Sequence, residues 1–360
     1  MDLLRLGWHA SFESSFAPFS AAGYLPARVA CEHKHSFSLY TPTGVLDAAC
    51  TGRLLHEARS RADLPSVGDW VVVKPRPRET FADIHAVLPR RTKFSRRASG
   101  PRPDEQIVAA NVDVVLLVTA LDANYNPRRI ERFLAVAWES GAQPVVVLNK
   151  SDLHADPAGA QHAISLVAPG APVLVISALD GTGLAGLSPY LHPGHTVAVL
   201  GSSGVGKSTL INALLGEVHQ DTGATRENDS RGRHTTTRRE LLLAPSGALI
   251  MDTPGMRELQ FHEDEASVED TFADILEQAS RCRFSDCSHR AEPGCAVQAG
   301  LADGTIAEDR WRSYQKLARE QTYAARKADT GAARREKAVW KKINAGQRAR
   351  RSWEQRNEIE

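Results

Sequence analysis

The sequence predicts a multidomain protein with a small antiparallel β-barrel, a central α/β domain built on a parallel sheet, and a mainly helical C-terminal domain. Short strand-like segments separated by turn residues occupy residues 24–97. Continuous apolar runs and an amphipathic segment follow from Val112, a pattern typical of parallel strands covered on both faces. Three cysteines and a histidine crowd into residues 282–295. The predicted boundaries are 1–97 for the barrel with an N-terminal extension, 98–104 for a linker, 105–262 for the α/β domain, 263–325 for the C-terminal domain and 326–360 for a tail.

The composition is that of a soluble globular protein. The chain has 360 residues, of which 24% are charged and 6% aromatic, so two or three domains are expected. It has no apolar run long enough to cross a bilayer, and no charged leader followed by an apolar core and a cleavage site. Five cysteines are too few for a secreted disulfide scaffold. We therefore expect a cytoplasmic monomer with no membrane partner.

The net charge of +1 hides an asymmetry. Residues 310–360 carry 15 Lys and Arg against 6 Asp and Glu, a net charge of +9, whereas the preceding residues carry 29 against 37, a net charge of −8. Two interpretations of the basic segment stay open. It is either a solvated helix with a charged face or a surface that contacts phosphate.

The predicted barrel rests on short strands whose spacing is typical of small antiparallel barrels. Turn residues at 42–44 and 66–68 separate them, and Ser, Gly and Pro at 98–103 indicate a linker. The expected strands are 27–30, 36–40, 69–73 and 84–88.

The α/β domain is predicted from apolar runs and one clear helical pattern. Ile130, Phe133, Leu134 and Ala137 repeat at i, i+3, i+4 and i+7, and Gly141 stands where a helix would end. The expected strands are 114–118, 145–148, 173–176, 197–200, 240–243 and 248–251.

A glycine-rich loop follows the expected strand at 197–200 and opens an apolar helix. Its glycines let the backbone curl so that successive N–H groups point at nucleotide phosphates, and the helix adds its positive end. Lys207 supplies a mobile cation, and Ser208 is the expected Mg²⁺ ligand. A glycine-rich turn by itself is often structural, but the strand and helix around this one favour nucleotide binding. The residues assigned to the loop are Gly201, Ser202, Ser203, Gly204, Val205, Gly206, Lys207, Ser208 and Thr209.

An Asn-Lys-x-Asp motif follows the expected strand at 145–148 and predicts a guanine base. The carboxylate of Asp152 can accept hydrogen bonds from N1 and N2 of guanine, whereas adenine would leave it desolvated and unpaired. The methylene stem of Lys150 can lie on the base. By itself the tetrapeptide is more typical of a capped turn; its place after a buried strand favours base recognition. The residues assigned to the base are Asn149, Lys150, Ser151, Asp152, Ser177 and Ala178.

The order of the motifs along the chain is unusual. A GTP site needs a phosphate loop, an Asp-x-x-Gly segment and a base-reading motif, and the last of these ordinarily comes last. Here the base-reading motif at 149–152 precedes the phosphate loop at 201–208 and the Asp-Thr-Pro-Gly segment at 252–255. The sequence therefore predicts a complete but circularly permuted P-loop GTPase domain.

Two further segments are expected to respond to the nucleotide. Asp252 would lie near Mg²⁺, and the N–H of Gly255 could sense the γ-phosphate. Met256 follows, where many GTPases carry a Gln that orients the attacking water. In the first switch, predicted at 232–237, His234 is the nearest group able to handle a water, although a lone loop histidine is more often a plain surface residue. The assignments are His234 for catalysis, Thr235, Thr236, Asp252 and Gly255 for GTP, and Ser208, Thr236 and Asp252 for Mg²⁺.

Three thiols and an imidazole occur within fourteen positions near the C-terminus. Four such ligands with no spare position form a closed structural Zn²⁺ site, one per chain. The segment around them is too polar to fold on a core of its own. Unrelated buried cysteines are the alternative. The expected ligands are Cys282, Cys287, His289 and Cys295.

Taken together, these motifs resemble the ribosome small-subunit-dependent GTPase A family, also called RsgA or YjeQ. The resemblance covers residues 24–321 and rests on the permuted motif order, the Gly-Arg-His-Thr-Thr-Thr segment at 232–237, Val67-Gly-Asp69 in the barrel and the Cys/His segment. It implies an OB-fold barrel, a permuted GTPase domain and a zinc domain. It also implies binding to the small (30S) ribosomal subunit and its rRNA during late maturation, with hydrolysis of GTP to GDP stimulated by that subunit. The basic tail lies outside the motif set, so its role stays open.

Two other functions are compatible with parts of the sequence. One is a non-catalytic RNA-binding adaptor with a vestigial nucleotide site, which the intact Lys207, Ser208 and Asp252 argue against. The other is an RNA-binding protein with a GTP switch that acts on another ribonucleoprotein or on the large subunit. A barrel and a zinc module beside the GTPase, with the basic tail, favour RNA as the partner.

Overall fold

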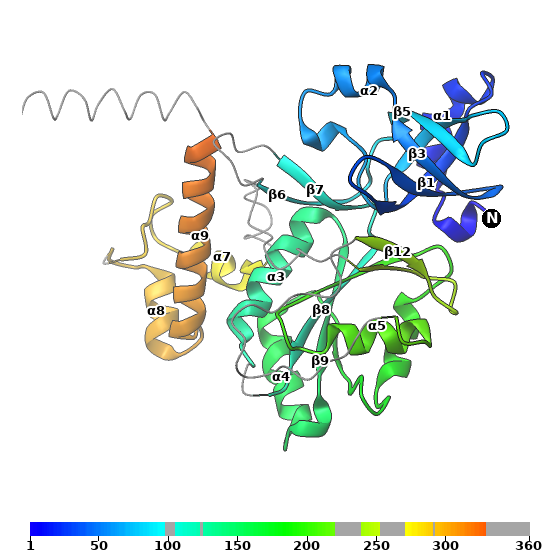
Figure 1. Ribbon diagram of the computed structural model, residues 1–360. Coiled ribbons are helices and arrows are strands. Elements are labelled where there is room, and N and C mark those ends of the chain that lie inside the picture. Colours follow the sequence, from blue (N-terminus) through cyan, green and yellow to red (C-terminus); the bar gives the residue numbers. More distant parts are fainter. Residues whose placement is uncertain (98–104, 123–124, 220–238, 253–270, 291, 329–360) are drawn as a thin grey trace, which may run out of the picture.

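The computed structural model describes residues 1–97, 105–122, 125–219, 239–252, 271–290 and 292–328 (Figure 1). The strands are β1 (Leu25–Glu32), β2 (Phe37–Thr41), β3 (Gly44–Cys50), β4 (Trp70–Pro75), β5 (Phe81–Val87), β6 (Lys93–Arg97), β7 (Glu105–Ala110), β8 (Val114–Ala120), β9 (Gln143–Asn149), β10 (Val173–Val175), β11 (Thr196–Gly201), β12 (Glu240–Leu243) and β13 (Leu249–Asp252). The α-helices are α1 (Ala10–Ser20), α2 (Gly52–Glu57), α3 (Pro127–Ser140), α4 (Pro157–Val167), α5 (Lys207–Leu215), α7 (Ala273–Ala279), α8 (Ala296–Asp303) and α9 (Glu308–Ala328). Short 3₁₀ helices are Leu4–Leu6, Arg61–Asp63, Ser151–Leu153 and Leu184–Tyr190. No helix in the described ranges is both long and apolar enough to span a membrane.

Five strands form the predicted N-terminal barrel, but it is not antiparallel throughout, because β3 and β5 pair in parallel. The strands are neighbours in the order β1, β2, β3, β5, β4, and β4 pairs back with β1, which closes the sheet on itself. Strand β3 was not among the expected strands, because only Ala48 of its seven residues is buried and the remainder lack a clear apolar period. Helix α1, also unexpected, buries Phe12 and Phe16, and the ring of Phe12 lies 5.9 Å from that of Trp70.

The six strands expected in the α/β domain all form. They are neighbours in the order β10, β9, β8, β11, β13, β12, and only β12 runs antiparallel to its neighbour in this set. Helices α3 and α4 pack on one face of the sheet and α5 on the other, because alternate residues of β8 point to opposite faces. The strands that come first in the chain, β8 to β10, lie on one side of β11, so the permuted order still yields one continuous sheet (Figure 1).

The barrel and the α/β domain share backbone hydrogen bonding. Strand β12 pairs antiparallel with β1 through Cys31 and Glu240, which joins the two sheets. Gly68, within the Val-Gly-Asp segment, has a φ of +89°, and a Cβ there would lie 2.1 Å from the carbonyl oxygen of Ala110. Glycine at position 68 therefore lets the barrel approach β7 closely. The segment 98–104, predicted as a linker, lies outside the described residues, and the strands that flank it, β6 and β7, pair with each other.

A buried arginine stands at the same junction. Arg28 on β1 is 1% exposed and donates to the carbonyls of Gly68 (3.3 Å), Asn111 (3.1 Å) and Leu6, and to the Thr196 hydroxyl (2.7 Å). Burial lowers the pKa of Arg28 to about 10, which leaves the guanidinium charged at neutral pH. One side chain thus connects the N-terminal segment, the barrel and the central sheet.

The C-terminal helices pack against the α/β domain through a buried ionic network. Glu131 on α3 is fully buried, and its Oε1 lies 2.9 Å from Nη1 of Arg310 on α9. Arg310 also donates to both carboxylate oxygens of Asp274 on α7 at 2.7 Å, and the Ser313 hydroxyl donates to Glu131 at 2.5 Å. Burial lowers the pKa of Arg310, but the hydrogen bonds to Asp274 and the charge of Glu131 outweigh it and raise the pKa above its ordinary value.

Replacing Arg310 by methionine is expected to destabilise the packing of α9 on α3 by about 3–5 kcal/mol, because a buried carboxylate then loses its main counter-charge. The measurement is hydrogen exchange of α9 together with the thermal midpoint. Arg312→Met on the same helix is the matched control, since its pair with Glu308 is exposed and should be worth less than about 1 kcal/mol. Equal effects of the two substitutions would show that the Glu131 network does not stabilise this interface.

Candidate GTP and zinc sites

The phosphate loop connects β11 to α5, and its glycines are required by positive φ values or by close contacts. Gly204 and Gly206 have φ values of +78° and +89°. A Cβ on Gly206 would lie 2.3 Å from Nδ2 of Asn149, and one on Gly201 would lie 2.3 Å from the carbonyl oxygen of Val118. The loop therefore curls tightly over the carboxyl ends of β8 and β9. Helix α5 begins at Lys207, so its free N–H groups face the same space.

Asn149 holds two loops of the site together. Its Nδ2 donates to the carbonyl oxygen of Val205 in the phosphate loop at 2.9 Å, and its Oδ1 accepts from the N–H of Ala178 at 2.9 Å. The side chain is 2% exposed. Because both ends of its amide are engaged, Asn149 positions the phosphate loop relative to the 177–178 loop.

The other residues assigned to the base occupy the ends of β9 and β10. Lys150 has a φ of +61°, and its Nζ donates to a carboxylate oxygen of Asp122 at 2.8 Å. Asp152 is exposed. Ser177 is fully buried, and its N–H donates to the carbonyl oxygen of Thr182 at 2.9 Å, which shapes the loop that includes Ala178.

Replacing Asp152 by asparagine is expected to weaken GTP binding roughly 10- to 100-fold, because one of the two guanine donors loses its acceptor and faces an N–H donor instead. The same variant should favour xanthine nucleotides, whose C2 oxygen needs a donor. Binding titrations with GDP and xanthosine diphosphate measure both effects, and a gain for xanthine distinguishes an altered base pocket from a damaged one. Unchanged GDP affinity would remove Asp152 from the site.

Two of the expected Mg²⁺ ligands lie at the same edge of the sheet. Asp252 is the last residue of β13, which pairs in parallel with β11, and Ser208 stands in the first turn of α5. A carboxylate and a hydroxyl beside a phosphate loop are the oxygen donors that Mg²⁺ prefers when it binds with a nucleotide. Ser208 and Asp252 therefore fit the ion. His234, Thr235, Thr236 and Gly255 lie outside the described residues.

The structure brings the four expected zinc ligands together. Cys282, Cys287, His289 and Cys295 each offer one ligand atom, and these atoms lie within 4.8 Å of one another. The sulfurs of Cys282 and Cys295 are 3.9 Å apart, and each is 3.5 Å from Nδ1 of His289. A tetrahedral site with Zn–S of about 2.3 Å and Zn–N of about 2.0 Å requires separations of about 3.8 Å and about 3.5 Å. The cluster fits a structural Zn²⁺ between α7 and α8.

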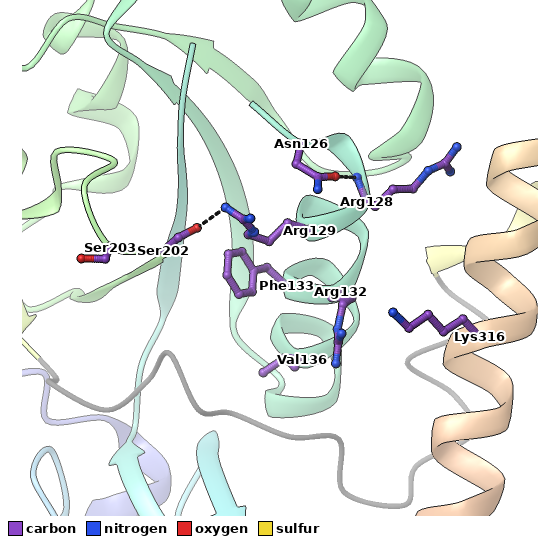
Figure 2. Close-up of a pocket in the computed structure, with 10 residues that line it drawn as sticks. Asn126, Arg128, Arg129, Arg132, Phe133, Val136, Ser202, Ser203 and Lys316 are labelled. Atoms are coloured by element: carbon purple, nitrogen blue, oxygen red, sulfur yellow. Dashed lines mark hydrogen bonds between the residues drawn. The ribbon is translucent and has the colours of Figure 1, made fainter. Parts of the chain in front are cut away.

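A pocket beside the phosphate loop contains cations that the sequence analysis missed. It has a volume of about 510 Å³ and lies between the start of the loop, α3 and α9 (Figure 2). Nη1 of Arg129 donates to the Ser202 hydroxyl at 2.7 Å. The sequence signal for this pocket is a pair of arginines, Arg128 and Arg129, which directly follow Asn126-Pro127 at the start of a predicted helix. The lining residues are Asn126, Arg128, Arg129, Arg132, Phe133, Val136, Gly201, Ser202, Ser203 and Lys316.

Comparison with known proteins agrees with this geometry. A sequence model described as RsgA GTPase matches residues 87–262, and one described as ABC transporter matches residues 184–348. The second range includes the phosphate loop, which nucleotide-binding domains of several families share, but excludes the base-reading motif at 149–152.

Two relatives span nearly the whole chain. The small ribosomal subunit biogenesis GTPase RsgA of Opitutus terrae is 56% identical over 359 residues, covering 97% of this chain and 98% of that protein. The protein of the same name from Methanosarcina acetivorans is 43% identical, covering 94% of this chain and 90% of that protein.

Solved structures show the same architecture. YjeQ from Thermotoga maritima superposes with a TM-score of 0.60 at 29% identity, covering 83% of this chain and 99% of that chain. YloQ, described as a circularly permuted GTPase, superposes with a TM-score of 0.59 at 24% identity, covering 83% and 95%; this second likeness concerns the fold alone. With a 56% identical relative along almost its full length, the permuted order of the GTPase motifs and a Cys₃His cluster, the chain belongs to the RsgA family of circularly permuted GTPases.

Proposed function

We propose that this GTPase binds the small ribosomal subunit and assists its late maturation, hydrolysing GTP to GDP and phosphate with stimulation by the subunit. Two observations support this proposal. The phosphate loop is intact and is bonded to Asn149 of the base-reading motif, and a 56% identical relative is named a small ribosomal subunit biogenesis GTPase. In this proposal the protein acts as a monomer in the cytoplasm and contacts rRNA.

The proposed site residues keep their expected roles. Residues 201–209 bind the phosphates, 149–152 with Ser177 and Ala178 hold the base, and Asp252 and Gly255 respond to the γ-phosphate. Mg²⁺, held by Ser208, Thr236 and Asp252, would neutralise charge on the β- and γ-phosphates. His234 orients the attacking water: the water oxygen bonds to the γ-phosphorus, the bond to the bridging oxygen of GDP breaks, and the proton passes to solvent. Met256 has no polar group for this role.

The RNA-binding surfaces proposed are the barrel, the zinc module and the basic tail. Barrels of the OB type bind oligonucleotides on one sheet face, and a segment with a net charge of +9 is drawn to phosphate. The proposed domains are 1–97, 105–262 and 263–325, with a linker at 98–104 and a basic tail at 326–360. Residues 329–360 of the tail lie outside the described residues, so its contribution rests on charge alone.

The GTPase rate with and without purified ribosomal subunits tests this function. We expect the small subunit to accelerate turnover and the large subunit to leave it near its intrinsic value. Equal stimulation by both subunits, or stimulation by the large subunit alone, would overturn the proposal in favour of another ribonucleoprotein partner. Absence of GTP turnover under all conditions would favour a non-catalytic adaptor.

A further inference from the structure

Ser202, the second residue of the phosphate loop, is held by two cations. Nζ of Lys207 donates to its carbonyl oxygen, and Nη1 of Arg129 donates to its hydroxyl at 2.7 Å. Lys207 belongs to the loop, whereas Arg129 comes from the first turn of α3, 73 residues earlier in the chain. Figure 2 shows the Arg129 guanidinium directed from α3 toward the start of the loop. A second positive charge thus stands at the place where nucleotide phosphates bind.

The charge of Arg129 is not compensated by a carboxylate within the described part of the chain. Its neighbour Arg128 differs, since it lies 3.4 Å from Glu131 and 3.4 Å from Asp309. Among the described residues, the neutral Ser202 hydroxyl is the only polar partner of the Arg129 side chain, which lines the pocket of about 510 Å³. A hydrogen bond to a hydroxyl is weaker than one to an anion, so a phosphate oxygen would compete well for this guanidinium.

Hydrolysis of GTP needs positive charge beside the transferring phosphoryl group. In several GTPases an arginine supplies it, either from the same chain or from a partner. His234 is proposed above to orient water, and Met256 cannot contribute. Arginine suits charge stabilisation because its planar guanidinium presents several donors in a fixed geometry, and it remains protonated throughout.

We infer that Arg129 is a catalytic arginine supplied by α3 of the same chain, which exchanges the Ser202 hydroxyl for oxygens of the γ-phosphate when GTP binds. In the free protein the Ser202 hydroxyl keeps the guanidinium beside the loop. With GTP bound, Arg129 stabilises the charge that develops on the γ-phosphoryl oxygens and transfers no proton. The inference concerns hydrolysis itself and is independent of which ribosomal subunit stimulates the protein.

The test uses the full-length protein without ribosomal subunits. Arg129→Ala is expected to slow single-turnover GTP hydrolysis roughly 10- to 100-fold, the difference between GTPases that carry such an arginine in the same chain and those that lack it. The affinity of the protein for GDP should change less than about threefold. The affinity of the GDP-bound protein for aluminium fluoride, which mimics the transferring phosphoryl group, should fall strongly, because the guanidinium acts on the transition state. Arg129→Lys keeps the positive charge but lacks the planar guanidinium, so its hydrolysis rate should lie between those of the parent and Arg129→Ala.

Two further variants separate catalysis from loop positioning. Lys316→Ala removes one positive charge from the same pocket on α9 and should leave hydrolysis near that of the parent. Ser202→Ala removes the hydroxyl that holds Arg129 and should lose far less activity than Arg129→Ala. If Ser202→Ala instead reproduced the full loss, Arg129 would only support the loop. Unchanged hydrolysis and aluminium fluoride affinity in Arg129→Ala would also overturn the inference.

Discussion

Replacing Cys287 by alanine is expected to abolish zinc binding and unfold the segment between α7 and α8. Most residues from 281 to 294 are exposed, so little apolar burial remains to stabilise this segment. Binding of structural zinc is worth about 10–16 kcal/mol in small zinc modules, and that free energy is folding free energy. Zinc content by atomic absorption and hydrogen exchange of α7 and α8 measure the two effects.

The same variant should bind GDP normally but lose stimulation by the small subunit. The base and phosphate loops lie in another domain, so their affinity should change less than about threefold. The zinc module, however, contacts α3 through the Arg310–Glu131 pair, and α3 carries Arg129 to the phosphate loop. Cys50→Ala is the control, because Cys50 lies in the barrel outside the cluster. Full stimulation of a zinc-free protein would contradict coupling between the zinc module and the GTPase site.

Replacing His234 by alanine is expected to leave GTP binding intact and to reduce subunit-stimulated turnover by roughly 10²–10⁴-fold, the range for a lost positioning or acid–base group. Met256 cannot polarise water, so intrinsic hydrolysis should be slow, and acceleration should come when the subunit orders the first switch. GTP affinity and turnover are measured separately, with and without small subunits.

His162→Ala is a suitable control for this substitution. His162 is an exposed histidine on α4 and does not belong to the predicted switch segment 232–237. If His234→Ala were stimulated as strongly as the parent, His234 would be a surface residue. The attacking water would then have to be positioned by backbone groups or by the ribosome.

The sequence predicted the elements and motifs that depend on residue types and spacing within a short segment. Parallel strands such as β8 and β9 are covered on both faces, so they must be apolar throughout and are recognised as continuous runs. The phosphate loop was predictable because a tight curl over neighbouring strands needs glycine at fixed positions. The zinc ligands were predictable because four soft ligands in a short segment have few other uses. Strand β3 was missed, since one buried residue among seven leaves no period to detect.

The tertiary structure alone decided which polar side chains meet. Asn149 belongs to a predicted motif, yet its amide connects two loops through Val205, 56 residues away, and Ala178. Arg129 reaches Ser202 across 73 residues, and Arg310 reaches Glu131 across 179. In the sequence these arginines look the same as solvent-exposed arginines on helices. Their partners are identified only in the folded chain, where the arginine and its partner are brought together and lose their contact with water. Sequence by itself therefore determined the strands of the central sheet and the ligand-binding motifs, whereas burial and close approach in the folded chain decided which charges contact the phosphate loop and which hold the domains together.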